Sequence, residues 1–259
     1  MTSAAPTLAT ESFTKLLIRG LLAGLIAGIL AGGVAFVLGE PHVESAIALE
    51  EAAAAAEPHE HATEAGGHSH AEEDALVSRT GQKAGLFLAT SLAGMALGAI
   101  FAVVLHYARR LTAMPGAVLA IILAGLGWLA IEAVPFFKYP ANPPAVGDPD
   151  TITQRTWLWL AAVILGLLAV TVGVFVARRV SHLNLTSVRV VAPIAAFLVV
   201  VVIGYLALPT IDEVGEDFPA TLLWDFRLAS LATQATLWLA LGAAFAFLTE
   251  RAARSASNA

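Results

Sequence analysis

Two pairs of histidines stand close together in a short tract that reads EPHEHATEAGGHSHAEED, residues 57–74. The pairs are His59-x-His61 and His68-x-His70, and they hold four of the seven histidines of the chain. Imidazoles at this spacing, beside carboxylates, can chelate borderline divalent ions such as Co²⁺, Ni²⁺, Zn²⁺ or Cu²⁺. The composition, without an apolar face, is typical of a flexible segment. We interpret the tract as a metal collector; the alternative is a solvated acidic loop with incidental histidines.

A second group of ligand-type side chains lies upstream, in the stretch GEPHVESAIALEE. Glu40, His42 and Glu44 offer carboxylate and imidazole groups to a metal ion. The chain has no cysteine, so any metal would be held by histidine, carboxylate or carbonyl ligands. If the stretch is a short surface helix, Glu40, Glu44 and Glu51 share one face, and Glu50 adds a further carboxylate.

A third group of polar side chains interrupts long apolar runs. Glu132 lies in WLAIEAVPFF, and Asp225, Arg227 and Gln234 lie in WDFRLASLATQATLW. Ionisable groups within apolar spans are costly and usually face the interior of a helix bundle or a wet cavity. One interpretation places Glu132 and Asp225 on an ion path, and the other is a structural ion pair such as Glu132 with Arg227. Both interpretations predict that the two acids face inward.

Helices that cross a lipid bilayer must position these side chains. The chain of 259 residues is 58% hydrophobic and only 13% charged, whereas soluble domains average about 25% charged residues. Six apolar stretches have the length of about 20 residues that a transmembrane helix needs. They are residues 16–38, 85–107, 116–137, 157–177, 190–208 and 221–248. The sequence therefore predicts an all-α integral membrane protein with six transmembrane helices.

The charges between the spans predict their orientation. If the N-terminus is cytoplasmic, nine of the fourteen lysines and arginines lie on the cytoplasmic side. Sixteen of the twenty acids then lie in three outer loops, residues 39–84, 138–156 and 209–220. The positive-inside rule thus selects an N-in/C-in topology, and the acidic outer face would concentrate cations. The net charge of −6, without a continuous basic patch, does not favour nucleic acid as a partner.

The three outer loops share a pattern that suggests an internal repeat. Each follows a helix that ends near a proline, and each leads back to an arginine near the start of the returning helix: Arg79, Arg155 or Arg227. This pattern predicts three helical hairpins in a pseudo-threefold arrangement. The alternative is coincidence, because proline ends helices in any case.

Glycines recur every four residues along the first span, at Gly20, Gly24, Gly28 and Gly32, and Gly94 and Gly98 repeat the spacing in the second. Such stripes predict close packing of two helix backbones. Motifs for chemistry are missing, since the chain has no G-x-x-x-x-G-K-[ST], no H-E-x-x-H and no nucleophile elbow. The sequence therefore predicts no nucleotide cofactor and no enzymatic activity.

Four blocks in the same order resemble CbtA, a family of predicted cobalt transporter subunits: GEPHVESAIALEEA, SRTGQKAGLFLAT, PFFKYPANPPAVGDPDTITQRT and LPTIDEVGEDFPATLLWDFRLASLATQATLW. The resemblance runs from about residue 13 to 250. It implies a multi-pass protein of the bacterial inner membrane that acquires cobalt, from a family often encoded together with a small single-span subunit. The family is usually described with five spans, against the six counted here. Candidate residues in the blocks are Glu40, Glu44, Glu50, Glu51, Arg79, Asp148, Arg155, Asp212, Glu213, Asp225 and Arg227.

The residues and the resemblance together predict a membrane component of divalent metal uptake, with Co²⁺ preferred and Ni²⁺ or Zn²⁺ as related substrates. The outer loops would collect the ion. The alternative is a non-transporting metal-binding or assembly subunit that delivers ions to a partner channel. A continuous polar track through the bundle would favour transport, and a core of glycine and leucine would favour the alternative. Oligomerisation is compatible with both.

Overall fold

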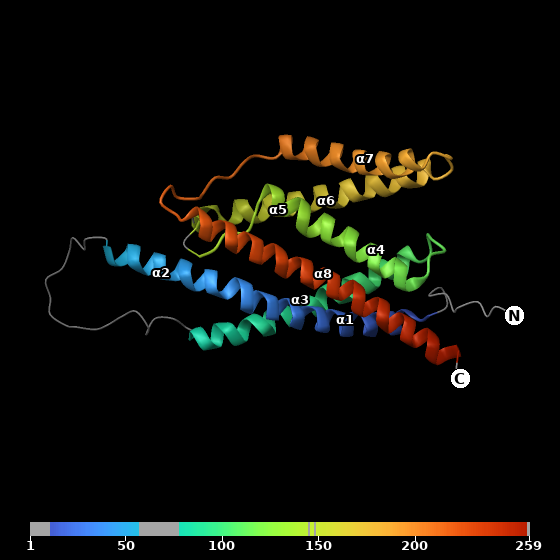
Figure 1. Ribbon diagram of the computed structural model, residues 1–259, viewed down its shortest axis with the longest axis horizontal. Helices are drawn as coiled ribbons and strands as arrows, with labels where there is room; N and C mark the ends of the chain where they lie inside the picture. Colours follow the sequence, from blue (N-terminus) through green and yellow to red (C-terminus); the bar gives the residue numbers. More distant parts are fainter. Residues whose placement is uncertain (1–10, 57–77, 145, 148, 258–259) are drawn as a thin grey trace.

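The computed structural model describes residues 11–56, 78–144, 146–147 and 149–257, and all regular structure within them is helical (Figure 1). The α-helices are α1 (Phe13–Val34), α2 (Glu40–Ala56), α3 (Arg79–Ala108), α4 (Gly116–Trp128), α5 (Val134–Lys138), α6 (Ile152–Val180), α7 (Thr186–Ala207) and α8 (Ala220–Ser257). Two π-helical turns, η2 (Ala35–Gly39) and η3 (Leu129–Ala133), join α1 to α2 and α4 to α5. A 3₁₀ turn, η4 (Pro149–Thr151), precedes α6.

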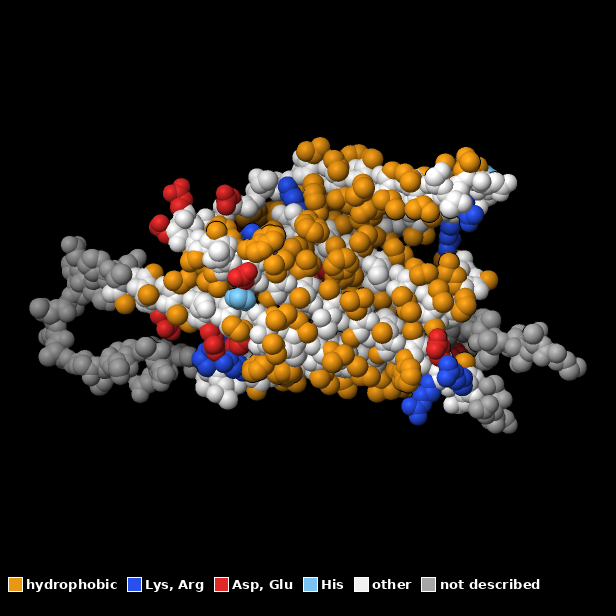
Figure 2. Space-filling view, viewed as in Figure 1, with side chains coloured by type: hydrophobic (Ala, Val, Ile, Leu, Met, Phe, Trp, Pro, Cys, Tyr) orange, Lys and Arg blue, Asp and Glu red, His pale blue; other side chains and the backbone are white. Residues whose placement is uncertain are grey.

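Six of the helical segments in the described residues are long and apolar enough to cross a membrane, which confirms the predicted fold class. Figure 2 shows hydrophobic side chains over the middle of the molecule and charged side chains toward its two ends. We call the end formed by residues 40–56, 138–144, 149–151 and 209–219 the acidic end. The opposite end, formed by residues 11–15, 108–115 and 178–189, is the basic end. α1 begins and α8 ends at the basic end (Figure 1).

α3 packs on α1, α1 on α8 and α8 on α4, while α6 packs on η3 and α5, which continue from α4, and α7 packs on α6. The main core lies among α1, α3, α4 and α8, where Leu16, Leu105, Leu241 and Phe245 are fully buried. A smaller cluster joins α5, α6 and α7 through Val134, Ala169 and Val201. α7 contributes only Val201 as a buried residue. The α6–α7 pair is therefore attached to the main bundle chiefly through η3 and α5.

The glycine stripes bring the backbones of α1 and α3 together, as the sequence predicted. A methyl group on Gly24 would lie 2.1 Å from the carbonyl oxygen of Gly94, and one on Gly98 would lie 2.1 Å from that of Gly20. Only hydrogen fits at these positions. This packing fixes the position of α1, against which α8 then packs.

The prolines Pro41 and Pro135 do not end their helices. The first span was predicted to end at residue 38, but the helical path continues through η2 and Pro41 to Ala56. Pro135 likewise follows η3 and lies at the start of α5. Proline cannot donate a helical hydrogen bond. A π-helical turn before each proline changes the hydrogen-bond spacing, so the helix accommodates the missing bond and continues. The helical path of the first span consequently continues past its predicted end, and α2, which carries the carboxylates, is this continuation.

The contacts do not form three equivalent hairpins around an axis. α1 and α3 pack together, but α7 packs on α6, whereas α8 lies between α1 and α4. The three arginines also have different partners: Arg79 pairs with Glu40 of its own hairpin, Arg155 pairs with Glu213, and Arg227 binds the segment before α6. The similar spacing along the chain is thus not accompanied by similar packing, because burial in the core determines the position of α8.

Candidate functional site

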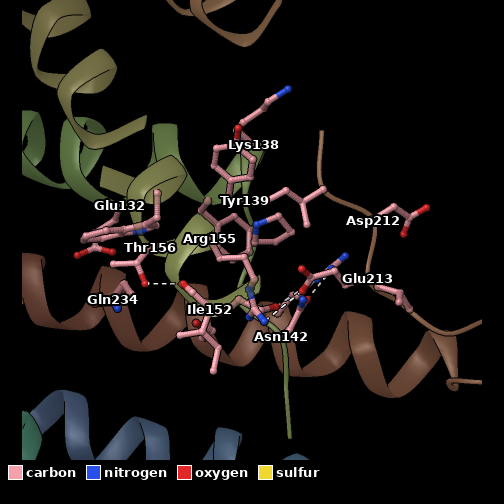
Figure 3. Close-up of a pocket in the computed structure, with 18 residues that line it drawn as sticks. Glu132, Lys138, Tyr139, Asn142, Ile152, Arg155, Thr156, Asp212, Glu213 and Gln234 are labelled. Carbon is pink, nitrogen blue, oxygen red and sulfur yellow. Dashed lines mark hydrogen bonds and ion pairs between the residues drawn. The ribbon is translucent and has the colours of Figure 1, made fainter. Parts of the chain in front are cut away.

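A cavity of about 760 Å³ opens at the acidic end, between α5, the start of α6, α8 and the segment before α8 (Figure 3). This is within the size range of small-molecule sites, roughly 300–1,000 Å³. It brings together several residues that are distant in the sequence and that the sequence singled out: Glu132, Arg155, Asp212, Glu213, Arg227 and Gln234.

Helical periodicity decides which residues of α8 reach the cavity. Arg227, Ser230 and Gln234 line it at spacings of three and four, which places them on one face of the helix. Asp225 is exposed and does not line the cavity. Each residue turns the helix by about 100°, so Asp225 faces away from the direction of Arg227. The prediction that both intramembrane acids face inward therefore matches the position of Glu132 but not that of Asp225.

Glu132 lies on η3, is half-buried and lines the cavity together with Gln234 (Figure 3). Its carboxylate accepts a hydrogen bond of 3.3 Å from the indole nitrogen of Trp238 on α8. Within the described part of the chain, Glu132 forms no ion pair with Arg227. The structural ion pair suggested as an alternative is absent there, and the carboxylate can face a ligand.

An ion pair forms one wall of the cavity. A guanidinium nitrogen of Arg155 lies 3.1 Å from a carboxylate oxygen of Glu213, whose side chain is only 10% exposed. Neither oxygen of Glu213 has a hydrogen-bond donor among the described residues, so its charge is balanced by Arg155 alone. Gly147 covers the pair with a φ angle of 115°, a conformation that favours glycine.

Replacing Gly147 by alanine is expected to destabilise this wall by about 1–3 kcal/mol. The added methyl group would lie 2.3 Å from a guanidinium nitrogen of Arg155, in addition to the backbone strain. Thermal unfolding in mild detergent, followed by tryptophan fluorescence, measures the loss. Gly215→Ala is the matched control, because a methyl group there meets no atom within 4 Å. Equal effects of the two substitutions would contradict the assigned role of Gly147.

The second cationic group of the cavity is Arg227, which is half-buried. It donates hydrogen bonds to the backbone oxygen of Ala141, at 3.3 Å, and to the side-chain oxygen of Asn142, at 2.9 Å. Both acceptors are neutral, and no carboxylate forms an ion pair with Arg227 within the described ranges. Its positive charge therefore remains available to an anionic group in the cavity.

The rim of the cavity is fastened to α7. Lys138 donates to the backbone oxygen of Tyr205 at 3.0 Å, and Figure 3 shows its side chain pointing away from Glu132. The hydroxyl of Tyr139 donates to the backbone oxygen of Pro209 at 2.7 Å. Partial burial raises the pKa of Tyr139, so its hydroxyl stays a neutral donor at physiological pH. These contacts hold the 209–219 segment beside the cavity.

Two carboxylates of α2, those of Glu40 and Glu44, are paired with cations of α3. Arg79 binds Glu40 and lies 3.8 Å from Glu44, and Lys83 binds Glu44. His42 is half-buried, and Glu50 and Glu51 are exposed. No group of three or more histidine, aspartate or glutamate side chains suited to a metal ion occurs among the residues that the structure describes. His59, His61, His68, His70 and Asp148 lie outside those residues.

Two residues that contact the site were not recognised in the sequence: Asn142 lines the cavity, and Trp238 donates a hydrogen bond to Glu132 without lining it. Asn142 lies within the proline-rich stretch YPANPP, and Trp238 follows Gln234 by one helical turn. The available signals were the amide of Asn142 between prolines and the position of Trp238 one helical turn after Gln234. Neither signal indicated a shared site, because Asn142 lies between α5 and α6 whereas Trp238 lies on α8, and the sequence does not show that these segments are neighbours.

A family comparison covers nearly the whole chain. The model of the family CbtA, described as a probable cobalt transporter subunit, matches residues 13–250. Comparison with curated proteins and with solved structures found no match. The family match covers the four sequence blocks that resemble CbtA, and it includes nearly all of the six apolar helices. This protein belongs to the CbtA family of probable cobalt transporter subunits.

Proposed function

We propose that this protein receives cobalt ions on the periplasmic side of the bacterial inner membrane and admits them to the bundle through the cavity at its acidic end. The acidic end would face the periplasm and the basic end the cytoplasm, as the positive-inside rule favours. The observation that carries the proposal is a cavity at that end with several charged side chains in its lining, in a membrane protein of a cobalt transporter family. Glu132 and Gln234 would receive the ion within the membrane region.

Collection of the ion would begin on the acidic segments outside the bundle. The pairs His59/His61 and His68/His70 supply imidazoles that suit Co²⁺, with Ni²⁺ and Zn²⁺ as competitors. Glu40, His42 and Glu44, together with Glu50, Glu51, Asp148 and Asp212, would add negative charge and weak ligands around the entrance.

Deletion of residues 57–74 is expected to reduce cobalt uptake at low cobalt concentration and to leave the fold intact. The tract has no apolar face to contribute to a core. Uptake as a function of cobalt concentration should show a raised KM with an unchanged maximal rate. Replacing the four histidines by glutamine at constant length is the control for the length of the segment. Loss of folded protein on deletion would contradict a collecting role.

Entry into the cell has two energetic routes, since the sequence has no Walker motif. An inside-negative membrane potential contributes about 4.6 kcal/mol per roughly 100 mV for two charges. The other route is an energy-supplying or channel-forming partner, consistent with the description of the family as a subunit. A small single-span partner subunit or a second copy of the chain would fill that role, and no enzymatic step is proposed.

A second candidate function is delivery of ions to a partner channel without transport by this chain. The interior below the cavity favours it, because the buried side chains of α8 after Gln234 are apolar or aromatic as far as Thr249: Leu237, Trp238, Leu241, Phe245 and Ala246. Gln234 and Thr249 are separated by about 22 Å along the helix. A transporting form would have to separate α8 from α4 along this stretch.

Uptake of radioactive cobalt by proteoliposomes that contain only the purified protein distinguishes the two functions. The experiment imposes an inside-negative potential and uses protein-free liposomes as the baseline. Saturable uptake that Ni²⁺ or Zn²⁺ inhibits would establish transport by this chain alone. Absence of uptake, with cobalt still bound to the protein, would establish the delivery function and direct attention to a partner. Absence of both uptake and binding would refute the proposal.

A further inference from the structure

We propose that the cavity binds cobalt as a complex with a small carboxylate-bearing chelator, with Arg227 receiving a carboxylate of the chelator and Glu132 facing the metal. This inference rests on the proposed function and names the chemical form of its substrate. It specifies that cobalt, whether or not the histidine tract first collects it, occupies the cavity as this complex rather than as a bare ion.

The size and the ligands of the cavity argue against a bare ion as its occupant. Its volume is about 760 Å³, and borderline divalent ions bind their nitrogen and oxygen ligands at about 2 Å. Nowhere in the described ranges do three or more histidine, aspartate or glutamate side chains gather to hold an ion. A chelator would supply the missing ligands and fill the remaining space.

The available charge of Arg227 points to an anionic edge on the ligand. Its hydrogen bonds use the Nε nitrogen and one terminal nitrogen, on the neutral oxygens of Ala141 and Asn142. The other terminal nitrogen makes no hydrogen bond or ion pair that the described residues provide. A guanidinium binds a carboxylate with two parallel hydrogen bonds. By contrast, the charge of Arg155 is already paired with that of Glu213, and this ion pair forms one wall of the cavity.

The separation of charges in the cavity matches a ligand that is both cationic and anionic. Arg227 and Gln234 lie on one face of α8, about 10 Å apart along the helix, and Glu132 lines the same cavity and accepts a hydrogen bond from Trp238, one helical turn beyond Gln234 (Figure 3). A bare cation would be repelled by Arg227, and a simple anion by Glu132. A metal chelate presents its metal to one and a carboxylate to the other, while Tyr139 and Trp159 provide aromatic walls.

Isothermal titration of the full-length protein in lipid nanodiscs tests this inference with three probes: the Co²⁺–citrate complex in excess citrate, metal-free citrate, and Co²⁺ alone. We expect the complex to bind and metal-free citrate to bind much more weakly. Arg227→Gln should weaken binding of the complex by about 10- to 100-fold, the range for a hydrogen bond to a charged group. Arg189→Gln, an exposed arginine at the basic end, is the matched control and should leave binding unchanged.

Three results would overturn the inference. They are loss of all cobalt binding in excess citrate, equal binding of citrate with and without metal, and equal effects of the two glutamine substitutions. Arg227→Lys retains the charge but not the paired hydrogen bonds, and it replaces Arg227→Gln if that variant unfolds. Cobalt uptake that excess citrate abolishes would refute the chelate while leaving the proposed function intact. Absence of uptake in both forms would refute the proposed function itself.

Discussion

Replacing Gly24 by alanine is expected to destabilise the protein by about 3 kcal/mol, the upper part of the range for an overpacked core. The added methyl group would lie 2.1 Å from the carbonyl oxygen of Gly94 and 3.1 Å from the α-carbon of Gly98. These are backbone atoms, which cannot rotate away, so α1 and α3 would have to separate. Because α8 packs on α1, the displacement would extend into the main core. Thermal or denaturant unfolding in mild detergent measures the loss.

The matched control for this substitution lies in the same helix. Gly33 is half-buried, and a methyl group there meets no atom within 4 Å. Alanine favours the helix over glycine by about 1 kcal/mol, so Gly33→Ala should be neutral or stabilising. The two variants differ only in the neighbour that the methyl group meets. If both behaved alike, close contact between the backbones of α1 and α3 would not contribute to stability.

Replacing Glu132 by glutamine is expected to reduce cobalt uptake by about 10- to 100-fold, the effect of losing a charged partner for a bound ligand. Glutamine has nearly the same shape, and its side-chain oxygen can still accept the hydrogen bond from Trp238. The fold should therefore be retained while the negative charge in the cavity is lost. Initial rates of cobalt uptake into proteoliposomes, normalised to folded protein, measure the effect.

Asp225→Asn is the matched control, because it also removes one negative charge but at a position outside the cavity. Asp225 was an equal candidate in the sequence, but its side chain is exposed and lies outside the cavity. We expect uptake close to that of the unaltered protein. An equally large loss in Asp225→Asn would mean that the general negative charge of the acidic end, rather than the carboxylate in the cavity, governs uptake.

The sequence by itself was sufficient to predict the helical architecture and its polarity. A run of about 20 apolar residues has few alternatives to a transmembrane helix, because its backbone groups must bond internally. The glycine stripe of the first span predicted its close packing for a similar local reason, since four-residue spacing places Gly20, Gly24 and Gly28 on one face. Nine of the fourteen lysines and arginines likewise belong to segments at one end of the bundle, although Figure 2 shows basic side chains at both ends.

Other features depended on contacts between distant segments. The spacing along α8 separates Asp225 from Arg227, but only the packing of α8 shows which face meets the cavity. Glu40 and Glu44 had the pattern of metal ligands, yet α3 supplies Arg79 and Lys83 as their partners. Local sequence cannot show such pairings, because they depend on which helices become neighbours.

The sequence alone therefore determined the number of membrane-spanning helices, the charges at their ends and the tight pairing of α1 with α3, all of which depend on composition and short-range spacing. Only the tertiary structure decided that Glu132, Asn142, Glu213 and Arg227 surround one cavity. These residues come from four different segments. Their approach follows from the burial of α8 between α1 and α4, a balance of contacts over the whole bundle.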